Sequence, residues 1–257
     1  ILLQEQNGFA GVTNKLLKDD AKKICVAYEG MERFFPKEKI ILTGNPVRQN
    51  LTSSSKVEAL KYFNETFGVN FTADKKTLLI IGGSLGARTI NQSIISHLNE
   101  LIESGIQVIW QTGKNYFADC KAALINNQLP IANSPIICTD FVSQMPLAYA
   151  LADLVISRAG ASSISELCLL GKPAILVPSP NVAEDHQTHN AMALVNKNAA
   201  VLVKDSDAQN NLIATALQLI KDDQQLLNLH TNILTLALPD SDRIIAAEVI
   251  KLAQKQE

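Results

Sequence analysis

The chain lacks several features that would define its function at once. It contains no run of basic residues, its formal net charge is −2 and its pI is about 6.1, so nucleic acid is a poor candidate partner. No apolar run approaches the roughly 18–20 residues that a membrane-spanning helix needs. The four cysteines stand far apart and form no C-x-x-C motif, which leaves zinc and redox motifs unsupported and suits a reducing compartment.

The common nucleotide-binding motifs are missing as well. The sequence IGGSLGAR, residues 81–88, has three glycines, but it is not G-x-G-x-x-G, and no G-K-[ST] follows that would make a P-loop. Gly82 and Gly83 permit a close approach of backbone or ligand, and Ser84 offers a hydroxyl and an amide. The segment can therefore be interpreted either as a tight strand-to-helix turn or as a phosphate-binding turn.

The start of the chain has neither the basic segment nor the long apolar stretch of a signal peptide. It opens on Ile1, and ILLQEQN is typical of the end of a strand that runs into a loop. Because a buried strand needs neighbours, we expect an N-terminal portion to precede this sequence in the complete protein.

What the sequence does contain is an alternation of strand and helix signals from Lys76 onward. Hydrophobic residues make up 47% of the 257, enough for a sizeable core. The strand-like runs are short, apolar on both faces and free of internal proline, which predicts an α/β fold with a doubly wound parallel sheet of about six strands. These runs are TLLIIGG, QVIWQT, PIICTDF, DLVISRAG, PAILVP and AAVLV.

The helical signals between and after these strands are of three kinds. Residues 87–104 carry an apolar stripe at helical spacing, and the stretch 164–171 predicts a short helix that ends at Gly171. The tail from residue 208 is helical, with Pro239 between its last two helices. Residues 1–50 differ: they predict a helix over 13–23 and strands over 24–29 and 39–44, before a polar, poorly patterned stretch over 49–75.

Four strand ends carry loops that could hold chemistry, the first being the glycine-rich turn. In TDFVSQMP, residues 139–146, a planar base could lie against Phe141 and Met145 and hydrogen-bond to the backbone of Val142, or the loop is a plain apolar anchor. In SRAGASSISE, residues 157–166, Ser163 and Glu166 fit a capping box, S-x-x-E, and the small residues at the helix start fit an anion site.

The fourth loop, NVAEDHQTHNA over 181–191, allows three interpretations. His186 and His189 are spaced i, i+3, but this spacing without H-E-x-x-H is a poor zinc signature. A helix start with Asp185 favourable to the helix dipole is the plain alternative. A sugar-binding cluster of Asp, His, Gln and Asn is the third.

The four loops fall at successive carboxyl ends of one predicted sheet, where α/β sheets bind ligands. This predicts a single phosphate-bearing ligand spread along that rim, with amides near Ala161 meeting a diphosphate and Glu166 accepting hydrogen bonds from ribose hydroxyls. The rim loops lack an Asp-x-Asp pair for a divalent ion. Helix amides, the glycine turn and the guanidinium of Arg48 offer charge neutralisation without a metal or another cofactor.

Five motifs in order, QEQNGFAGVTNKLL, TGNPVR, GGSLGAR, SRAGASSISEL and EDHQTHNA, resemble the MurG family of bacterial glycosyltransferases over essentially the whole chain. The resemblance implies the two-domain GT-B fold and an inverting, metal-independent transfer of N-acetylglucosamine from UDP-GlcNAc to undecaprenyl-pyrophosphoryl-MurNAc-pentapeptide (lipid I), a step of peptidoglycan synthesis. It also implies a peripheral location at the cytoplasmic face of the bacterial inner membrane. One departure is Gln4 where the family usually has His.

The resemblance implies a domain division and a set of donor-binding residues. Residues 1–50 would be the remainder of a truncated acceptor domain, 51–75 a linker, 76–238 the complete Rossmann-like UDP-GlcNAc domain and 239–257 a helix that packs back on the first domain. The general base and the membrane-facing surface would lie in the absent N-terminal part, so this chain would bind the donor only. The implied binding residues are Asn7, Arg48, Ser84, Val142, Met145, Ala161, Ser162, Ser163, Glu166, His186, Gln187 and Asn190.

Two alternatives stay open beside this expectation. The chain could be a non-catalytic UDP-GlcNAc-binding subunit completed by a separate partner, although residues 1–50 favour a truncated enzyme instead. A UDP-GlcNAc epimerase on the same fold is the other, and the pair EDHQTHNA and TGNPVR argues against it.

Overall fold

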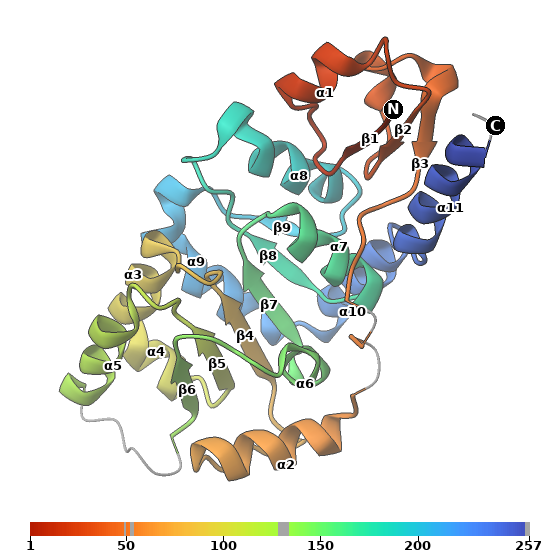
Figure 1. The fold of residues 1–257 in the computed structure, drawn as a ribbon. Coiled ribbons are helices and arrows are strands. Elements are labelled where there is room, and N and C mark those ends of the chain that lie inside the picture. Colours follow the sequence, from red (N-terminus) through yellow and green to blue (C-terminus); the bar gives the residue numbers. More distant parts are fainter. Residues whose placement is uncertain (49, 52–53, 128–133, 255–257) are drawn as a thin grey trace.

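The computed structural model describes residues 1–48, 50–51, 54–127 and 134–254 and contains two parallel sheets. The larger sheet has the order β6-β5-β4-β7-β8-β9, so the expected doubly wound sheet of six strands is confirmed (Figure 1). Its strands are β4 (Thr77–Ile81), β5 (Gln107–Gln111), β6 (Ile136–Thr139), β7 (Leu154–Ser157), β8 (Ala174–Leu176) and β9 (Val201–Leu202).

Helices cover both faces of this sheet, which is why most residues of its strands are apolar. Every residue of β4, β5, β7 and β8 is buried. One core holds residues of α2 (Lys56–Phe67), α6 (Met145–Leu151), α7 (Ala161–Leu170) and α8 (His186–Val195). The core on the other face holds residues of α3 (Arg88–Ser96), α4 (Leu98–Glu103), α5 (Phe117–Asn126), α9 (Asp205–Ile220) and α10 (Asp223–Leu234).

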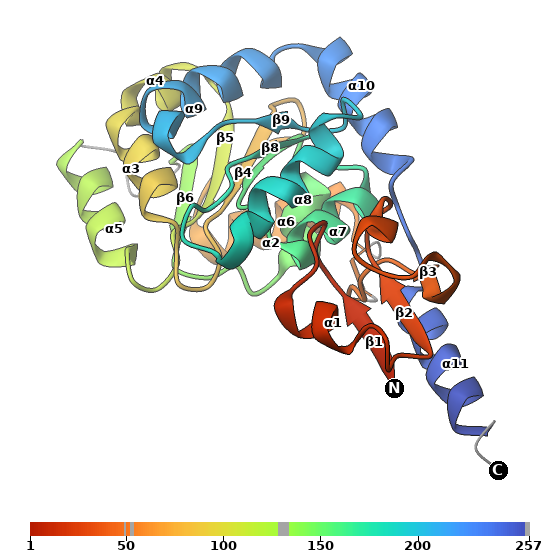
Figure 2. The ribbon, with the colours of Figure 1, turned by 90° about the horizontal axis from the view of Figure 1, so that it is seen from above.

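The smaller sheet is formed by the first fifty residues and has its own small core, which includes Leu3, Ile24 and Phe35. Its strands β1 (Leu2–Glu5), β2 (Lys23–Val26) and β3 (Ile40–Leu42) are parallel in this order. The helix α1 (Val12–Leu17) and two short 3₁₀ turns, η1 (Met31–Arg33) and η2 (Lys37–Lys39), complete it. The last helix, α11 (Ser241–Gln254), lies beside β3 in both views (Figures 1 and 2).

The polar stretch over 49–75, which the sequence predicts to be a linker and the entry to the next domain, contains the helix α2. The Ser55 side chain accepts from the amide of Glu58, and the Glu58 side chain accepts from the amide of Ser55, which is a complete capping box. On α2, the buried Ala59 and Phe63 pack into the core beneath the larger sheet. The S-x-x-E pattern was therefore an available signal for this helix.

Two helices that the sequence predicts, over 87–104 and over 13–23, are shorter in the structure. The helix expected over 87–104 is broken at His97, whose backbone is not helical (φ −123°, ψ 24°) and whose Nδ1 lies 2.8 Å from the carbonyl oxygen of Ser93. The helix expected over 13–23 ends at Leu17. Pro239 does lie between α10 and α11, and Gly171 ends α7 in the left-handed conformation, as predicted.

The strand order determines where a ligand can bind. The chain leaves β4 toward β5 on one side, whereas β7 and β8 follow on the other, so the neighbours β4 and β7 form the topological switch point. Crevices open beyond the carboxyl ends of the strands at such a point. The glycine-rich turn follows β4 and the SRAGASS segment follows β7, so both flank this position. No helix in the described ranges is long and apolar enough to cross a membrane.

Gly171 provides a test of the packing between α7 and α10. A Cβ added there would lie 2.7 Å from the ring of His230 and from Leu234, and the residue also has a φ of +62°. We expect Gly171→Ala to lower the free energy of unfolding by about 1–2 kcal/mol for the backbone and by about 1–3 kcal/mol more for the clash.

Gly68→Ala is the matched control, because Gly68 has the same left-handed backbone (φ +63°) and nothing within 4 Å of its added Cβ. Denaturant titration of both variants measures the difference. Equal losses for the two would show that the contact with α10 is loose.

Candidate functional site

The turn after β4 is forced by close packing against the end of β5. Gly83 and Gly86 have left-handed backbones (φ +80° and +93°). A Cβ on Gly82 would lie 3.2 Å from the carbonyl oxygen of Gln111, and one on Gly86 would run into the ring of Tyr116. The glycines therefore make a tight turn, and that turn presents Ser84 to solvent.

The start of α7 is free of bulky side chains and has no side-chain cap. Gly160 is the N-cap residue, and its carbonyl accepts the first intrahelical bond from Ile164. The amides of the first turn, Ala161 to Ser163, have no carbonyl of the same helix to bind, as in any helix start. The capping box proposed for Ser163 and Glu166 is wrong, because Ser163 is the third residue inside the helix rather than its cap.

Glu166 is buried in the second turn of α7 and is held from two sides. Its Oε1 accepts from Arg48 Nε at 2.9 Å and its Oε2 accepts from Arg48 Nη2 at 3.0 Å. The hydroxyl of Tyr149, on α6, also donates to Oε2 at 3.0 Å. Burial, together with the charge of Glu166, raises the pKa of Tyr149, so the phenol remains a donor across the ordinary pH range.

Arg48 is thus placed on the carboxylate expected to bind ribose, although the sequence suggests a contact to phosphate. Its side chain is half exposed, with a relative accessibility of 50%, whereas that of Glu166 is 10%. Arg48 lies in the segment that follows β3, and Glu166 lies on α7, which follows β7. The ion pair therefore joins the segment from the smaller sheet to the larger part of the chain.

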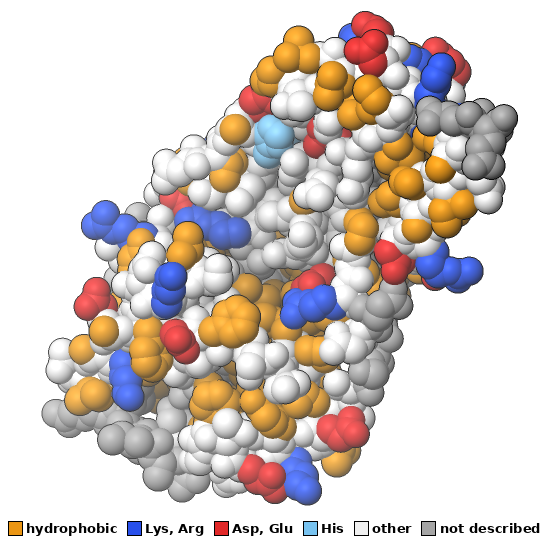
Figure 3. Space-filling view, in the orientation of Figure 1, with side chains coloured by type: hydrophobic (Ala, Val, Ile, Leu, Met, Phe, Trp, Pro, Cys, Tyr) orange, Lys and Arg blue, Asp and Glu red, His pale blue; other side chains and the backbone are white. Residues whose placement is uncertain are grey.

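The loop after β6 is tied to the neighbouring strand. The amide of Val142 donates to Gln111 Oε1 at 3.0 Å, so this N–H is already bound, and Val142 itself is buried. Met145 lies in the core, with a relative accessibility of 6%, whereas Phe141 is 56% exposed. Of the apolar side chains expected to face a base, Phe141 is therefore the accessible one. On the face shown in Figure 3, hydrophobic side chains gather near α6 beside charged ones.

The loop before α8 turns sharply, since Glu184 and Asp185 both have left-handed backbones (φ 51°). His186 Nε2 lies 3.4 Å from Glu184 Oε2, and Lys15 of α1 binds the other oxygen of Glu184 at 3.2 Å. Gln187 Oε1 accepts from the amide of Ser179 at 2.8 Å. These contacts fix the loop and bring α1 of the smaller part against it.

Asn190, which the family resemblance assigns to the donor-sugar motif, is fully buried in this structure. It has no accessible surface, and its Oδ1 accepts from the amide of Gly8 at 2.7 Å. Its Nδ2 donates to Asn7 Oδ1 at 3.0 Å and to the carbonyl of Ala159 at 3.2 Å. Asn190 therefore joins the loop after β1 to the loop before α7. Asn7 is partly exposed, whereas Asn190 is not.

The side chains that could bind a metal ion do not form a cluster in the described residues. Within the described ranges, no group of three or more His, Cys, Asp or Glu side chains is placed to hold a metal ion. Outside the four rim loops, an Asp-x-Asp pair does follow β9, at Asp205 and Asp207. Arg158 and the Thr89 hydroxyl both bind Asp205, and the pair lies in the first turn of α9.

Sequence reasoning missed three groups that shape this rim. Tyr149 and Gln111 hold Glu166 and Val142 in place, and Arg158 binds Asp205 and the carbonyls of Val177 and Pro178. A buried polar residue in an otherwise apolar strand or helix, as Gln111 and Tyr149 are, was the available signal.

A six-stranded doubly wound sheet with a second parallel sheet beside it has the architecture of the GT-B type, and its rim offers helix amides, a glycine turn and a buried carboxylate. The model of the glycosyltransferase family 28 C-terminal domain matches residues 77–242, and the chain belongs to this family.

The particular relatives are bacterial. The chain is 56% identical to a protein of Parabacteroides distasonis and 58% identical to one of Bacteroides thetaiotaomicron, covering 99% of this chain and 67% of each relative. Both are named UDP-N-acetylglucosamine–N-acetylmuramyl-(pentapeptide) pyrophosphoryl-undecaprenol N-acetylglucosamine transferase. The chain thus spans about two thirds of the length of these relatives.

Among solved structures, MurG of Acinetobacter baumannii is 28% identical, with a TM-score of 0.72, over 99% of this chain and 66% of that one. A UDP-GlcNAc 2-epimerase of Neisseria meningitidis is 18% identical, with a TM-score of 0.60, over 92% of this chain and 63% of that one. The second likeness concerns the fold alone.

The buried position of Asn190 predicts a large cost of removing its amide. We expect Asn190→Ala to lower the free energy of unfolding by about 2–4 kcal/mol, because each buried partner left unsatisfied, such as the Gly8 amide, costs about 1–3 kcal/mol. Gln187→Ala, one turn earlier and half-buried, loses one hydrogen bond and should cost less than about 1.5 kcal/mol. Urea unfolding of both variants measures the contrast, and a loss for Asn190→Ala no greater than that of the control would contradict it.

Proposed function

We propose that this chain is the donor-binding part of an enzyme that transfers N-acetylglucosamine from UDP-GlcNAc to undecaprenyl-pyrophosphoryl-N-acetylmuramyl-pentapeptide. The observation that carries the proposal is the identity of 56–58% over 99% of the chain to relatives named for this reaction. The rim supports it, since the motifs that resemble the family surround the switch point of the larger sheet.

The nucleotide would lie along the ends of β4, β6 and β7. Glu166 has two carboxylate oxygens with several lone pairs, so it can accept from ribose hydroxyls while Tyr149 continues to hold it. The half-exposed guanidinium of Arg48 has further N–H donors beyond those that bind Glu166 and would meet the diphosphate together with the amides of the first turn of α7. Phe141 offers an apolar surface to the base.

The donor sugar would face the loop before α8 and the first loop of the chain. His186 and Gln187 are half-buried and positioned by Glu184 and the Ser179 amide, and Asn7 lies opposite on the smaller part. Asn190 would act through Asn7, since it holds the Asn7 side chain and is itself inaccessible. The glycine-rich turn would contribute the exposed Ser84.

In the reaction, the acceptor hydroxyl would attack C1 of the sugar opposite the diphosphate, which inverts the configuration. A base would remove the hydroxyl proton, and UDP would leave with its charge stabilised by Arg48 and the α7 amides. We assign the base to no residue of this chain. The acceptor in the relatives' name carries undecaprenol, a lipid, which supports a reaction at a membrane surface. The cytoplasmic face of the bacterial inner membrane is the location that the family resemblance implies.

The first test is the loss of UDP affinity when Glu166 is changed. We expect Glu166→Gln to weaken UDP binding by about 10- to 100-fold, or about 1–3 kcal/mol, because a charged acceptor of hydrogen bonds becomes neutral. Isothermal titration with UDP and with UDP-GlcNAc measures it. Glu58→Gln, on the exposed start of α2, is the control and should leave the affinity unchanged. Unchanged affinity for Glu166→Gln would reject the placement of the nucleotide.

A second test concerns metal. Since fixed N–H donors at α7, the glycine turn and Arg48 can neutralise a diphosphate, we expect the UDP affinity with EDTA to equal that with millimolar magnesium within about twofold. The same titration in the two buffers measures it. Binding that EDTA abolishes and a divalent ion restores would overturn the metal-free mechanism.

A further inference from the structure

Arg158 and Asp205 form an ion pair beside the rim that the proposed mechanism does not use. Arg158 lies between β7 and α7, two residues before the N-cap Gly160, and Asp205 is the first residue of α9. Arg158 Nη1 donates to Asp205 Oδ1, and the two side chains have relative accessibilities of 17% and 18%. Charged groups so little exposed need a partner, because water cannot compensate them fully. Each member of the pair therefore holds the other in place.

The same guanidinium binds the end of a neighbouring strand. Nη1 of Arg158 also donates to the carbonyl oxygens of Val177 at 3.1 Å and of Pro178 at 3.2 Å, directly after β8. The next residue, Ser179, donates its amide to Gln187 Oε1 in the loop expected to face the donor sugar. Arg158 thus connects the segment before α7 to the loop that leads to α8.

The carboxylate of the pair binds a third segment of the rim. Asp205 Oδ2 accepts from the hydroxyl of Thr89 at 2.9 Å. Thr89 is in the first turn of α3, two residues after the glycine-rich turn over 82–87. α3 and α9 are also joined by Ser93, whose hydroxyl donates to the carbonyl of Ala208 at 2.9 Å. Asp205 therefore relates the glycine-rich turn to the start of α7.

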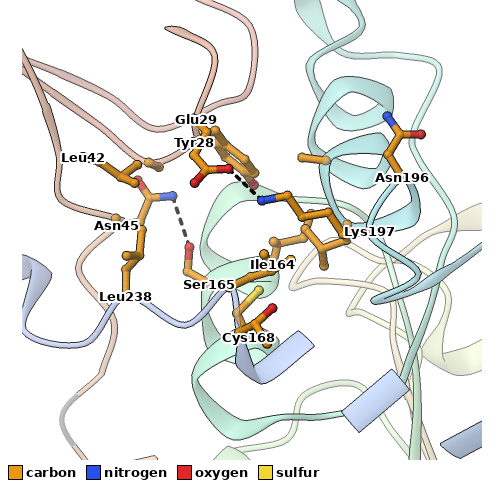
Figure 4. Close-up of a pocket in the computed structure, with 16 residues that line it drawn as sticks. Tyr28, Glu29, Leu42, Asn45, Ile164, Ser165, Cys168, Asn196, Lys197 and Leu238 are labelled. Atoms are coloured by element: carbon orange, nitrogen blue, oxygen red, sulfur yellow. Dashed lines mark hydrogen bonds and ion pairs between the residues drawn. The ribbon is translucent and has the colours of Figure 1, made fainter. Parts of the chain in front are cut away.

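The side of α7 that faces the smaller sheet borders a cavity of about 300 Å³ (Figure 4). Here Asn45 donates to Ser165 of α7 at 3.2 Å. This bond and the pair of Arg48 with Glu166 both bind the second turn of the helix. Neither binds the first turn, whose free amides directly follow the segment that contains Arg158.

The charge of the pair distinguishes it from a phosphate ligand. A cation ahead of a helix start opposes the positive end of the helix dipole, and a free guanidinium there would itself attract a diphosphate. Asp205 offsets the charge of Arg158, and its own position in the first turn of α9 is favourable to that dipole. The pair is therefore suited to holding segments of the rim together rather than to neutralising the ligand.

We propose that Arg158 and Asp205, together with Thr89, are positioning residues for the diphosphate of the donor. They fix the glycine-rich turn, the first turn of α7 and the end of β8 relative to one another. This assignment rests on the proposed function, since it concerns the same nucleotide site. The nucleoside does not share the dependence, because Glu166 has partners of its own outside the pair. Loosening the pair should weaken ligands that carry a diphosphate and spare uridine.

Asp205→Asn tests the pair, because it removes the charge and keeps the shape of the side chain. Titration of UDP and of uridine into the ¹⁵N-labelled chain, followed by NMR, gives both dissociation constants. We expect the variant to bind UDP about 5- to 30-fold more weakly, through misplaced N–H donors, and uridine within about twofold of the unsubstituted chain. Asp207→Asn is the matched control, since it removes the same charge from an exposed position in the same turn of α9. It should leave both affinities unchanged.

Thr89→Val is the milder variant, and it decides the question if Asp205→Asn does not fold. It deletes the hydroxyl that binds Asp205 and keeps the ion pair. We expect UDP to bind about two- to fivefold more weakly and uridine to bind as before. Thr215→Val is its control, because the Thr215 hydroxyl binds only the carbonyl of Asn211 on the exposed side of α9.

The ratio of the UDP and uridine affinities separates positioning from stability. A pair that only stabilises the fold would lower the melting temperature of the variants and leave this ratio unchanged, which would overturn the proposal. Tighter UDP binding by Asp205→Asn would also overturn it, because the freed Arg158 would then be a ligand of the phosphates. If the unsubstituted chain binds no UDP, the proposed function itself is rejected and this assignment with it.

Discussion

A carboxylate buried in the second turn of α7 needs partners, and the need to supply them organises much of the molecule. Glu166 receives two N–H groups from Arg48 and a hydroxyl from Tyr149. Removing any of these would leave a charge in a place where water cannot compensate it fully. Arg48 comes from the segment that crosses from the smaller sheet, so the pairing also determines where that segment runs.

A second set of buried contacts acts beside this pair. Asn190 binds the loop after β1 and the carbonyl of Ala159, and Asn45 binds Ser165 of α7 and the carbonyl of Gln6. Each of these side-chain amides forms hydrogen bonds with residues of both the smaller and the larger part of the chain. The helix whose first turn carries the free amides is thus positioned from the smaller sheet, which gives the first fifty residues a direct role in the geometry of the rim.

The sequence is sufficient to predict the sheet and insufficient to predict the contacts across the junction. Short apolar strands separated by helical stripes predict a doubly wound sheet, because periodicity reports burial. The S-x-x-E pattern predicts a capping box at Ser163 and Glu166, whereas the structure forms one at Ser55 and Glu58. Both pairs have the same spacing, and only tertiary contacts decide that Glu166 turns toward Arg48. The same limit explains Asn190: a polar residue in a sugar-binding motif gives no sign of its burial, since its partners lie about 180 residues away.

The bond from Gln111 to the Val142 amide connects the rim to the register of the sheet. Gln111 is the last residue of β5 and is paired with Ile81 and Thr139. Because side chains alternate between faces along a strand, a slip of β5 by one residue would turn Gln111 away from the loop and bring Trp110 or Thr112 in its place, neither of which has an amide oxygen in its side chain. A chain that mispaired its central strands would therefore lose the loop anchor in the same event that disturbed its core. Only molecules with the correct pairing of β5 can therefore hold the Val142 loop through Gln111.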